Sequence, residues 1–236
     1  MPLGAVKVGL FAAAGAAGGA TGAGYFGGGK TPTKVTTVDR FLFSDDSRTT
    51  LGTGLSAATE SLAGMAGTVA GYFGGGTTGS LVTTVDRFLF SDDSRTTLGT
   101  GLSATTRSLG AMASDVAGYF GGGFNDDPAD DEVTTVDRFL FSDDSRTTLG
   151  TGLSAATQAL AGMASTVAGY FGGGYVSGSV DTVDRFLFSD DSRTTLGTGL
   201  SAANQDGAAM ASTVAGYFGG GAGLGALRGR SISSRP

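Results

Sequence analysis

Four pairs of adjacent aspartates are the strongest candidates for chemistry in this sequence. They are Asp45 and Asp46, Asp92 and Asp93, Asp143 and Asp144, and Asp190 and Asp191. Two carboxylates that flank a sugar bond are the groups that a glycosidase uses. These pairs, however, stand in identical Ser-Asp-Asp-Ser segments, and neighbours on one turn rarely face each other across a substrate. We therefore expect turn-forming aspartates, and a calcium site is disfavoured because the alternating ligand spacing of calcium loops is absent.

Other catalytic groups are scarce. The chain has no histidine and no cysteine, which excludes Ser-His-Asp catalysis, imidazole and thiolate metal sites, and disulfides. Its only lysines are Lys7, Lys30 and Lys34, so a serine or threonine nucleophile lacks an obvious base. The recurring Tyr-Phe-Gly-Gly-Gly segment lacks the Lys-Ser or Lys-Thr ending of a phosphate-binding loop. We expect no enzyme activity, no cofactor and no metal site.

Asp39 and Arg40 begin a series of four Asp-Arg dipeptides. Adjacent residues of a strand point to opposite faces, so each dipeptide places one charge on either side of a sheet. We expect these charges to pair between neighbouring sheets, for instance Asp86 with Arg95 or with an arginine next door. Such pairs would set the spacing of sheets rather than recognise a ligand.

These residues recur because the whole chain is a tandem repeat. The tyrosine of the Gly-Tyr-Phe-Gly-Gly-Gly block stands at Tyr25, Tyr72, Tyr119, Tyr170 and Tyr217, with spacings of 47, 47, 51 and 47 residues. The Val-Asp-Arg-Phe-Leu-Phe-Ser-Asp-Asp-Ser block begins at Val38, Val85, Val136 and Val183. One half of the unit is therefore present five times and the other half four times.

Each unit is predicted to form four short strands. In the second copy these are strands a (Leu62 to Ala66), b (Val69 to Phe73), c (Val85 to Phe90) and d (Arg95 to Leu98). Short turn segments separate or end these strands, namely Gly-Thr, triple glycine, Ser-Asp-Asp-Ser and Gly-Thr-Gly. Glycine interrupts every candidate helix before three turns can form.

The order of these features resembles the kelch repeat, in which an aromatic residue and a diglycine on strand b precede an acidic residue on strand c. The resemblance covers nearly the whole chain, but Thr49 and Thr50 stand where a kelch repeat usually has tryptophan. A further likeness is to short Tyr-Phe-Gly-Gly-Gly kelch-like arrays in bacteriophage virion proteins. The resemblance implies a β-propeller built of four-stranded antiparallel blades.

Length and composition agree with one repeat domain. Five units of 47 residues account for 235 of the 236 residues, which predicts five blades in a single domain spanning 1–236. The approximate repeats are 14–60, 61–107, 108–158, 159–205, and 206–236 together with 1–13. Of the 15 phenylalanines, 13 lie at repeat positions on strands b and c, so the chain can build a core. The net charge of −6 and the absence of a basic stripe make nucleic acid an improbable partner.

The N-terminal region contains 22 uncharged residues between Lys7 and Lys30. That count could span a bilayer, but the stretch is mostly glycine and alanine, so no membrane span is expected. A cleaved signal peptide is a better alternative interpretation of this stretch than a membrane span. Because residues 14–29 align with 61–76 at an offset of 47, we interpret the stretch as a diverged pair of strands a and b.

The fifth unit lacks its own strands c and d. We expect the chain ends to supply them, with residues 224–233 as strand c and residues 3–8 as strand d. Pairing both ends in one blade would remove an exposed strand edge, which is an aggregation hazard. The sequence therefore predicts a ring whose fifth blade is closed by the N- and C-terminal strands.

While the a–b turn varies only among glycine, serine, threonine and aspartate, variation between the units concentrates in two places, the b–c loop and the d–a junction. In an up-and-down sheet these connections lie on the same rim, called the variable rim below. Its loops are 30–34, 77–81, 124–132 and 175–181. The candidate binding residues are Glu60, Arg107, Asn125, Asp126, Asp127, Gln158, Tyr175, Gln205 and Asp206. Loops on a rigid scaffold are common binding sites, although drift on an unconstrained surface is an equal alternative.

These observations predict a non-enzymatic binding or assembly module that contacts a protein or glycan surface. The phage resemblance implies a virion surface or appendage component, in a virion or extracellular location, that assembles with other copies or virion proteins. A multivalent carbohydrate-binding lectin is the alternative. A propeller glycosidase is a third and less favoured interpretation.

Overall fold

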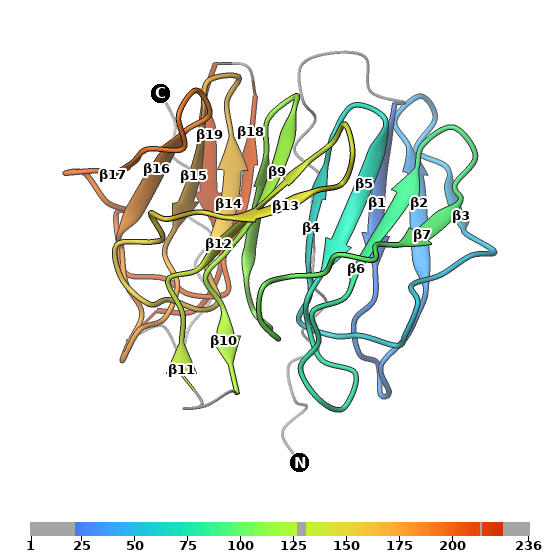
Figure 1. Cartoon of the computed structure of the whole chain (residues 1–236), viewed down its shortest axis with the longest axis horizontal. Helices are drawn as coiled ribbons and strands as arrows, with labels where there is room; N and C mark the ends of the chain where they lie inside the picture. The colour runs from blue at the N-terminus through green and yellow to red at the C-terminus, as the bar shows by residue number, and fades with distance from the viewer. Residues whose placement is uncertain (1–21, 127–130, 213, 224–236) are drawn as a thin grey trace.

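The computed structural model describes residues 22–126, 131–212 and 214–223. Every regular element in them is a β-strand, and the strands form antiparallel sheets that follow one another in chain order (Figure 1). The sequence prediction of an all-β fold with several four-stranded sheets is therefore confirmed.

Three sheets are complete. The second sheet contains β4 (Ala63–Ala66), β5 (Ala70–Gly74), β6 (Val85–Leu89) and β7 (Arg95–Thr97). The third contains β8 (Gly110–Ala113), β9 (Ala117–Gly121), β12 (Val136–Leu140) and β13 (Arg146–Thr148). The fourth contains β14 (Ala161–Ala164), β15 (Ala168–Gly172), β16 (Val183–Leu187) and β17 (Arg193–Thr195). Each strand lies within one residue of its predicted bounds.

The first and fifth sheets contain fewer strands among the described residues. The first has β1 (Ala23–Gly27), β2 (Val38–Leu42) and β3 (Arg48–Thr50), and the fifth has β18 (Ala208–Ala211) and β19 (Gly216–Gly219). A small hairpin of β10 (Phe124–Asn125) and β11 (Asp131–Glu132) projects at the lower edge of Figure 1. The strands predicted from residues 3–8 and 224–233 lie outside the described residues, as does most of the uncharged N-terminal stretch.

Glycine ends strand b because the chain must turn there. In the second unit Gly75 and Gly76 have φ values of 68° and 94°, a region that residues with a Cβ rarely adopt. The strand before them is buried along its whole length, from Ala70 to Gly74. The triple glycine therefore stops the strand and lets its end pack against the next sheet.

Neighbouring sheets pack through an aromatic ring set against a glycine. A Cβ added to Gly74 would lie 2.7 Å from Cζ of Phe120 in the following sheet, so the ring occupies that space. The same arrangement joins Phe73 to Gly27, Phe171 to Gly121, and Phe218 to Gly172. Phe73, Phe120 and Phe171 are buried, and each stabilises the fold by roughly 1.5 to 3 kcal/mol, whereas Phe218 is only partly buried.

The first strands of the sheets, β4, β8, β14 and β18, contact one another in series. Their residues are small, and the methionines of the first three reach into the next unit, where Met65 lies against Gly118, Met112 against Gly169 and Met163 against Gly216. Methionine thus fills the space between sheets, as its flexible side chain allows. This arrangement, with strand a on the inside of each sheet, is consistent with a propeller.

Candidate functional site

The variable rim forms where each junction pairs with a b–c loop. Glu60 and Thr77 exchange two backbone hydrogen bonds, of 3.2 Å and 2.9 Å. Equivalent bridges join Arg107 to Phe124, Gln158 to Tyr175, and Gln205 to Ala222. The two variable regions therefore lie together on one rim, as the alternating strand direction predicts.

Charged side chains on this rim link successive units. Glu60 accepts ion pairs from the b–c loop of the first unit, with Lys34 Nζ at 3.5 Å and Lys30 Nζ at 3.9 Å from its Oε1. The Lys34 and Glu60 side chains are 20% and 26% exposed, so solvent screens this pair only in part. Glu60 thus orders two neighbouring loops.

The equivalent positions in later units make different contacts. The guanidinium carbon of Arg107 lies 4.6 Å from the centroid of the Phe124 ring, a cation–π geometry. Gln158 Nε2 donates to Glu132 Oε1 at 2.8 Å, and Ser179 Oγ donates to Gln205 Oε1 at 3.3 Å. One scaffold position therefore presents a carboxylate, a cation or an amide, depending on the unit.

Four further candidate binding residues of the variable rim are Asn125, Asp126, Asp127 and Asp206. Thr105 Oγ1 lies 3.5 Å from Asn125 Oδ1 and 3.4 Å from Asp126 Oδ1. Asp127 lies outside the described residues. Asp206 has a φ of 55°, and its N–H donates to the carbonyl oxygen of Ala159 at 2.9 Å, so it forms part of the junction backbone.

On the opposite rim the two aspartates of the second, third and fourth pairs have separate roles. Asp92 Oδ1 accepts a hydrogen bond from the backbone N–H of Ser94 at 3.0 Å, which closes the c–d turn. Hydrogen bonds from Ser94 lower the pKa of Asp92 below its ordinary value. Asp93 has a φ of 58°, and its carboxylate accepts hydrogen bonds from Tyr25 and Arg40 of the preceding sheet. The prediction of turn-forming aspartates holds for both, and the second aspartate also joins two sheets.

This contact, called the Tyr–Arg–Asp clamp below, occurs three times in the part of the chain that the structure describes. In the second copy Tyr72 Oη donates to Asp144 Oδ1 at 2.9 Å and Arg87 Nη1 donates to Asp144 Oδ2 at 2.6 Å. The third copy joins Tyr119 and Arg138 to Asp191. Burial and the bond to Asp93 raise the pKa of Tyr25 to about 12, and the same causes raise the pKa of Tyr72 and Tyr119.

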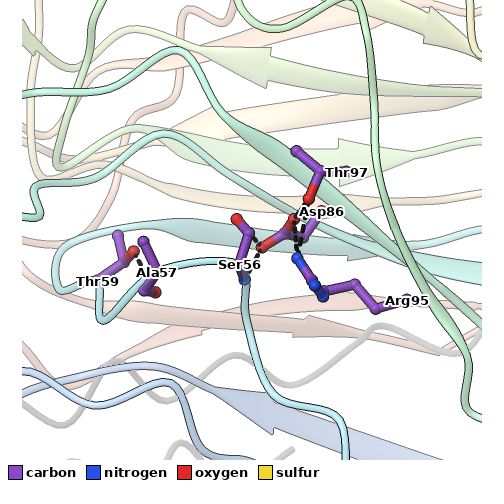
Figure 2. Close-up of polar contacts among 6 residues, drawn as sticks. All are labelled: Ser56, Ala57, Thr59, Asp86, Arg95 and Thr97. Carbon is purple, nitrogen blue, oxygen red and sulfur yellow. Dashed lines mark hydrogen bonds and ion pairs between the residues drawn. The ribbon is translucent and has the colours of Figure 1, made fainter.

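A second contact between sheets is centred on Asp86, which is only 3% exposed. Figure 2 shows its carboxylate between Ser56 of the preceding junction and Arg95 and Thr97 of its own sheet. Ser56 donates through its N–H at 2.7 Å and its Oγ at 2.8 Å. Asp86 pairs with Arg95 as predicted, at 3.4 Å, but the two residues lie in one sheet, so the expectation that this pair joins neighbouring sheets was wrong. Because the buried charge of Asp86 has several donors, its desolvation is offset. Arg87, the other charge of the Asp-Arg dipeptide, does pair between sheets, with Asp144.

Some functions have no structural support among the described residues. In residues 22–126, 131–212 and 214–223, no three acidic side chains are grouped in a way that could hold a metal ion. The described part of the chain contains no helix that is long and apolar enough to cross a membrane.

Comparison with known proteins identifies a shared fold. No protein family model matches the sequence, and no curated protein matches it. Among solved structures, the chain is similar to that of YjhT, with a TM-score of 0.73 and 12% identity over 88% of this chain and 76% of that chain. The chain shares its fold with YjhT. At this identity the likeness concerns the fold alone, and it agrees with a propeller-like arrangement of the sheets.

Sequence reasoning did not identify the serines that bind the buried aspartates or the tyrosines that bind the turn aspartates. The Ser56 contact recurs as Ser103 with Asp137 and Ser154 with Asp184. A signal for it was present, because these serines belong to a Leu-Ser-Ala segment that is identical in all four copies and directly precedes the variable part of the junction. Their invariance separates them from the neighbouring positions Glu60, Arg107, Gln158 and Gln205.

Proposed function

We propose that this chain is a non-enzymatic binding or assembly module that makes its specific contacts through the variable rim. One observation carries the proposal. The rim presents different side chains at equivalent positions, whereas strand c, the c–d turn and strand d repeat unchanged and the a–b turn of the opposite rim varies only among glycine, serine, threonine and aspartate. An invariant scaffold that carries individual loops is the usual arrangement of a recognition surface.

The proposal extends to a kelch-like ring of five blades, with the first sheet following the fifth. Support for the ring comes from side chains on the fifth and first sheets that are exposed although their counterparts in other sheets are packed against a neighbouring sheet. Met210 and Tyr217 on the fifth unit are 59% and 53% exposed, whereas Met112 and Tyr119 are 3% and 2% exposed. On the first unit Phe43 is 64% exposed, although its counterparts Phe90 and Phe141 stack on the tyrosines of preceding sheets. Ring closure would bring these two half-interfaces together.

We propose no catalytic role, because both carboxylates of the second, third and fourth aspartate pairs are already bound. Asp92 closes its own turn, and Asp93 accepts hydrogen bonds from two side chains of another sheet. A general acid or nucleophile needs an oxygen that is free to meet substrate. Release of a chromophore from aryl glycosides that is abolished by Asp93→Asn alone would contradict this proposal.

The binding surface is tested by comparing matched variants on two probes. We expect Arg107→Ala with Gln158→Ala, on the variable rim, to weaken binding to the bound members of a glycan array or to a virion-protein panel. The control is Asp92→Asn with Asp143→Asn on the opposite rim, which should bind like the wild type. Equal effects of the two double variants would refute the rim as the contact surface.

The same experiment separates the two partner classes. Glycan signals that rise with ligand density would favour a multivalent lectin. Binding to a single virion protein, lost when residues 124–132 are replaced by the short loop of the second unit, would favour an assembly module that contacts protein.

A further inference from the structure

Each place where one sheet packs against the next is called a step below. The Tyr–Arg–Asp clamp includes an aromatic partner in the three steps where it is complete. Tyr119 stacks on Phe188 with ring centroids 5.5 Å apart, and its hydroxyl donates to Asp191 at 2.8 Å. Phe188 and Asp191 are three residues apart, at the end of strand c and in the c–d turn of the following unit. One short segment of the next sheet therefore supplies both the ring and the carboxylate.

The fourth step has only the donor half of this clamp. Tyr170 and Arg185 occupy the positions of Tyr119 and Arg138, and they lie side by side in the register of β15 and β16. Among the described residues neither has an acidic partner, whereas the corresponding tyrosine and arginine of the three earlier sheets all do. The last step therefore presents a phenol and a guanidinium without their acceptor.

A cavity of about 140 Å³ lies beside Tyr170. Its lining includes Met163, Ser165, Val214 and Gly216. It corresponds to the site filled by a phenylalanine in earlier steps. Its volume is comparable to the ~150 Å³ of an apolar cavity that holds a benzene ring.

The correspondence is direct in the step between the second and third sheets. There the Phe141 ring lies where a Cβ on Gly67 or Gly118 would fall, at 2.8 Å and 3.1 Å. Gly67 and Gly118 are the counterparts of Ser165 and Gly216 in the repeat. The cavity beside Tyr170 is thus shaped for an aromatic side chain.

Among the residues that the structure describes, the fifth sheet ends at β19 on the same side as this cavity. Strands β5, β9 and β15 each pair with a strand on both sides, whereas β19 pairs only with β18 among the described residues. An open edge offers unpaired backbone N–H and C=O groups to an added strand. Backbone pairing and a pocket for an alternate side chain are the two parts of recognition by strand addition.

Neither residues 1–21 nor residues 224–236 carry a side chain that could serve as the missing carboxylate. Residues 1–21 and 224–236 contain no aspartate and no glutamate, and the second segment carries Arg228, Arg230 and Arg235. Those arginines would place further positive charge near Arg185, which disfavours the predicted use of residues 224–233 as strand c. Charge complementarity requires an acidic segment instead.

We propose that the fifth sheet is an acceptor site for an extended strand of a partner protein, with an aromatic residue three positions before an aspartate. The strand pairs with the β19 edge, its ring enters the cavity between Met163 and Tyr170, and its carboxylate accepts hydrogen bonds from Tyr170 and Arg185. This site is separate from the variable rim, so it gives the module a second contact.

The test uses the full chain and a labelled peptide with the sequence of residues 183–196, which carries Phe188 and Asp191 at the required spacing. Fluorescence anisotropy should show saturable binding to the wild-type protein. We expect Phe188→Ala or Asp191→Asn in the peptide to weaken binding about tenfold or more, since each removes one half of the clamp. Tyr170→Phe with Arg185→Met in the protein should have a similar effect.

Tyr119→Phe is the matched protein control, because that tyrosine belongs to a step already filled, and this variant should bind the peptide like the wild type. Three results would overturn the proposal. They are no binding of the peptide by the wild-type chain, equal binding of the Asp191→Asn peptide, and binding only after residues 224–236 are deleted. The last result would show that the chain's own tail covers the edge.

Discussion

Tyr72 and Asp144 are 72 residues apart in sequence, yet the tyrosine hydroxyl donates a hydrogen bond of 2.9 Å to the aspartate carboxylate. Arg87 donates to the other oxygen of the same carboxylate at 2.6 Å. The contact ties strands b and c of one unit to the c–d turn of the next. The packing of successive sheets thus depends on residues that the repeat duplicates together.

The clamp aspartate should matter more for stability than its neighbour in the same turn. We expect Asp144→Asn to lower the free energy of unfolding by about 1 to 3 kcal/mol, because Tyr72 and Arg87 lose a charged acceptor. Asparagine tolerates the φ of 58° at this position, so the backbone is preserved. Urea unfolding measures the effect, and Asp143→Asn, which keeps the turn-closing oxygen, should change stability by about 0.5 kcal/mol or less. Equal losses would show that the turn, and not the contact between sheets, is what matters.

Gly74 should not accept a side chain. A Cβ there would lie 2.7 Å from Phe120 Cζ, so we expect Gly74→Ala to destabilise the fold by about 1 to 3 kcal/mol through overpacking. Gly99→Ala is the control, since nothing lies within 4 Å of its added Cβ. Adding Phe120→Leu should recover part of the Gly74→Ala loss in a double-mutant cycle. Simple additivity of the two changes would contradict direct contact.

The free energy of unfolding should fall as the pH rises above about 10, and each buried tyrosine with a raised pKa should contribute to the fall. The pKa of Tyr25 is about 12 in the folded chain and its ordinary value is 10.0. Below pH 10 both states keep the proton, so the stability from this group is fully present. Between pH 10 and 12 only the unfolded state releases the proton, and up to about 2 to 3 kcal/mol is lost as the pH rises through the folded value.

Urea unfolding of the wild type and Tyr25→Phe at several pH values from 9 to 11.5 measures this loss. The variant should be less stable near pH 9, because the bond to Asp93 is missing, but its stability should fall less steeply above pH 10. Parallel curves would argue against a raised pKa of Tyr25.

Closure of the ring can be tested with a single disulfide, because the chain has no cysteine of its own. The contact of Met163 with Gly216 predicts that Met210 of the fifth unit meets Gly24 of the first unit in a closed ring. Oxidation of Met210→Cys with Gly24→Cys should give a cross-linked monomer. Its faster migration than the reduced form on a non-reducing gel is the readout. The pair Met210→Cys with Gly99→Cys serves as the control and should stay reduced, and cross-linked dimers alone would contradict closure within one chain.

The local structure of this protein was determined by the sequence. The repeat of 47 residues, the β-branched and aromatic strand c, and the triple glycine after Tyr72 and Phe73 were enough to place each strand within about a residue, because turn chemistry and strand propensity act over a few neighbouring residues. The location of the variable positions on one rim also followed, since it needs only the alternation of strand direction.

The partners of the repeated charges were decided by the tertiary structure alone. Asp92 and Asp93 are adjacent and chemically identical, yet one closes its own turn and the other binds Tyr25 and Arg40 from the preceding sheet. Tyr119 and Tyr170 likewise have the same sequence neighbours, but among the described residues the sheet that follows Tyr119 has four strands and supplies its aspartate, whereas the sheet that follows Tyr170 has two. A hydrogen bond needs two groups at about 3 Å with the right direction, and for residues some 70 positions apart that geometry exists only once the sheets have packed.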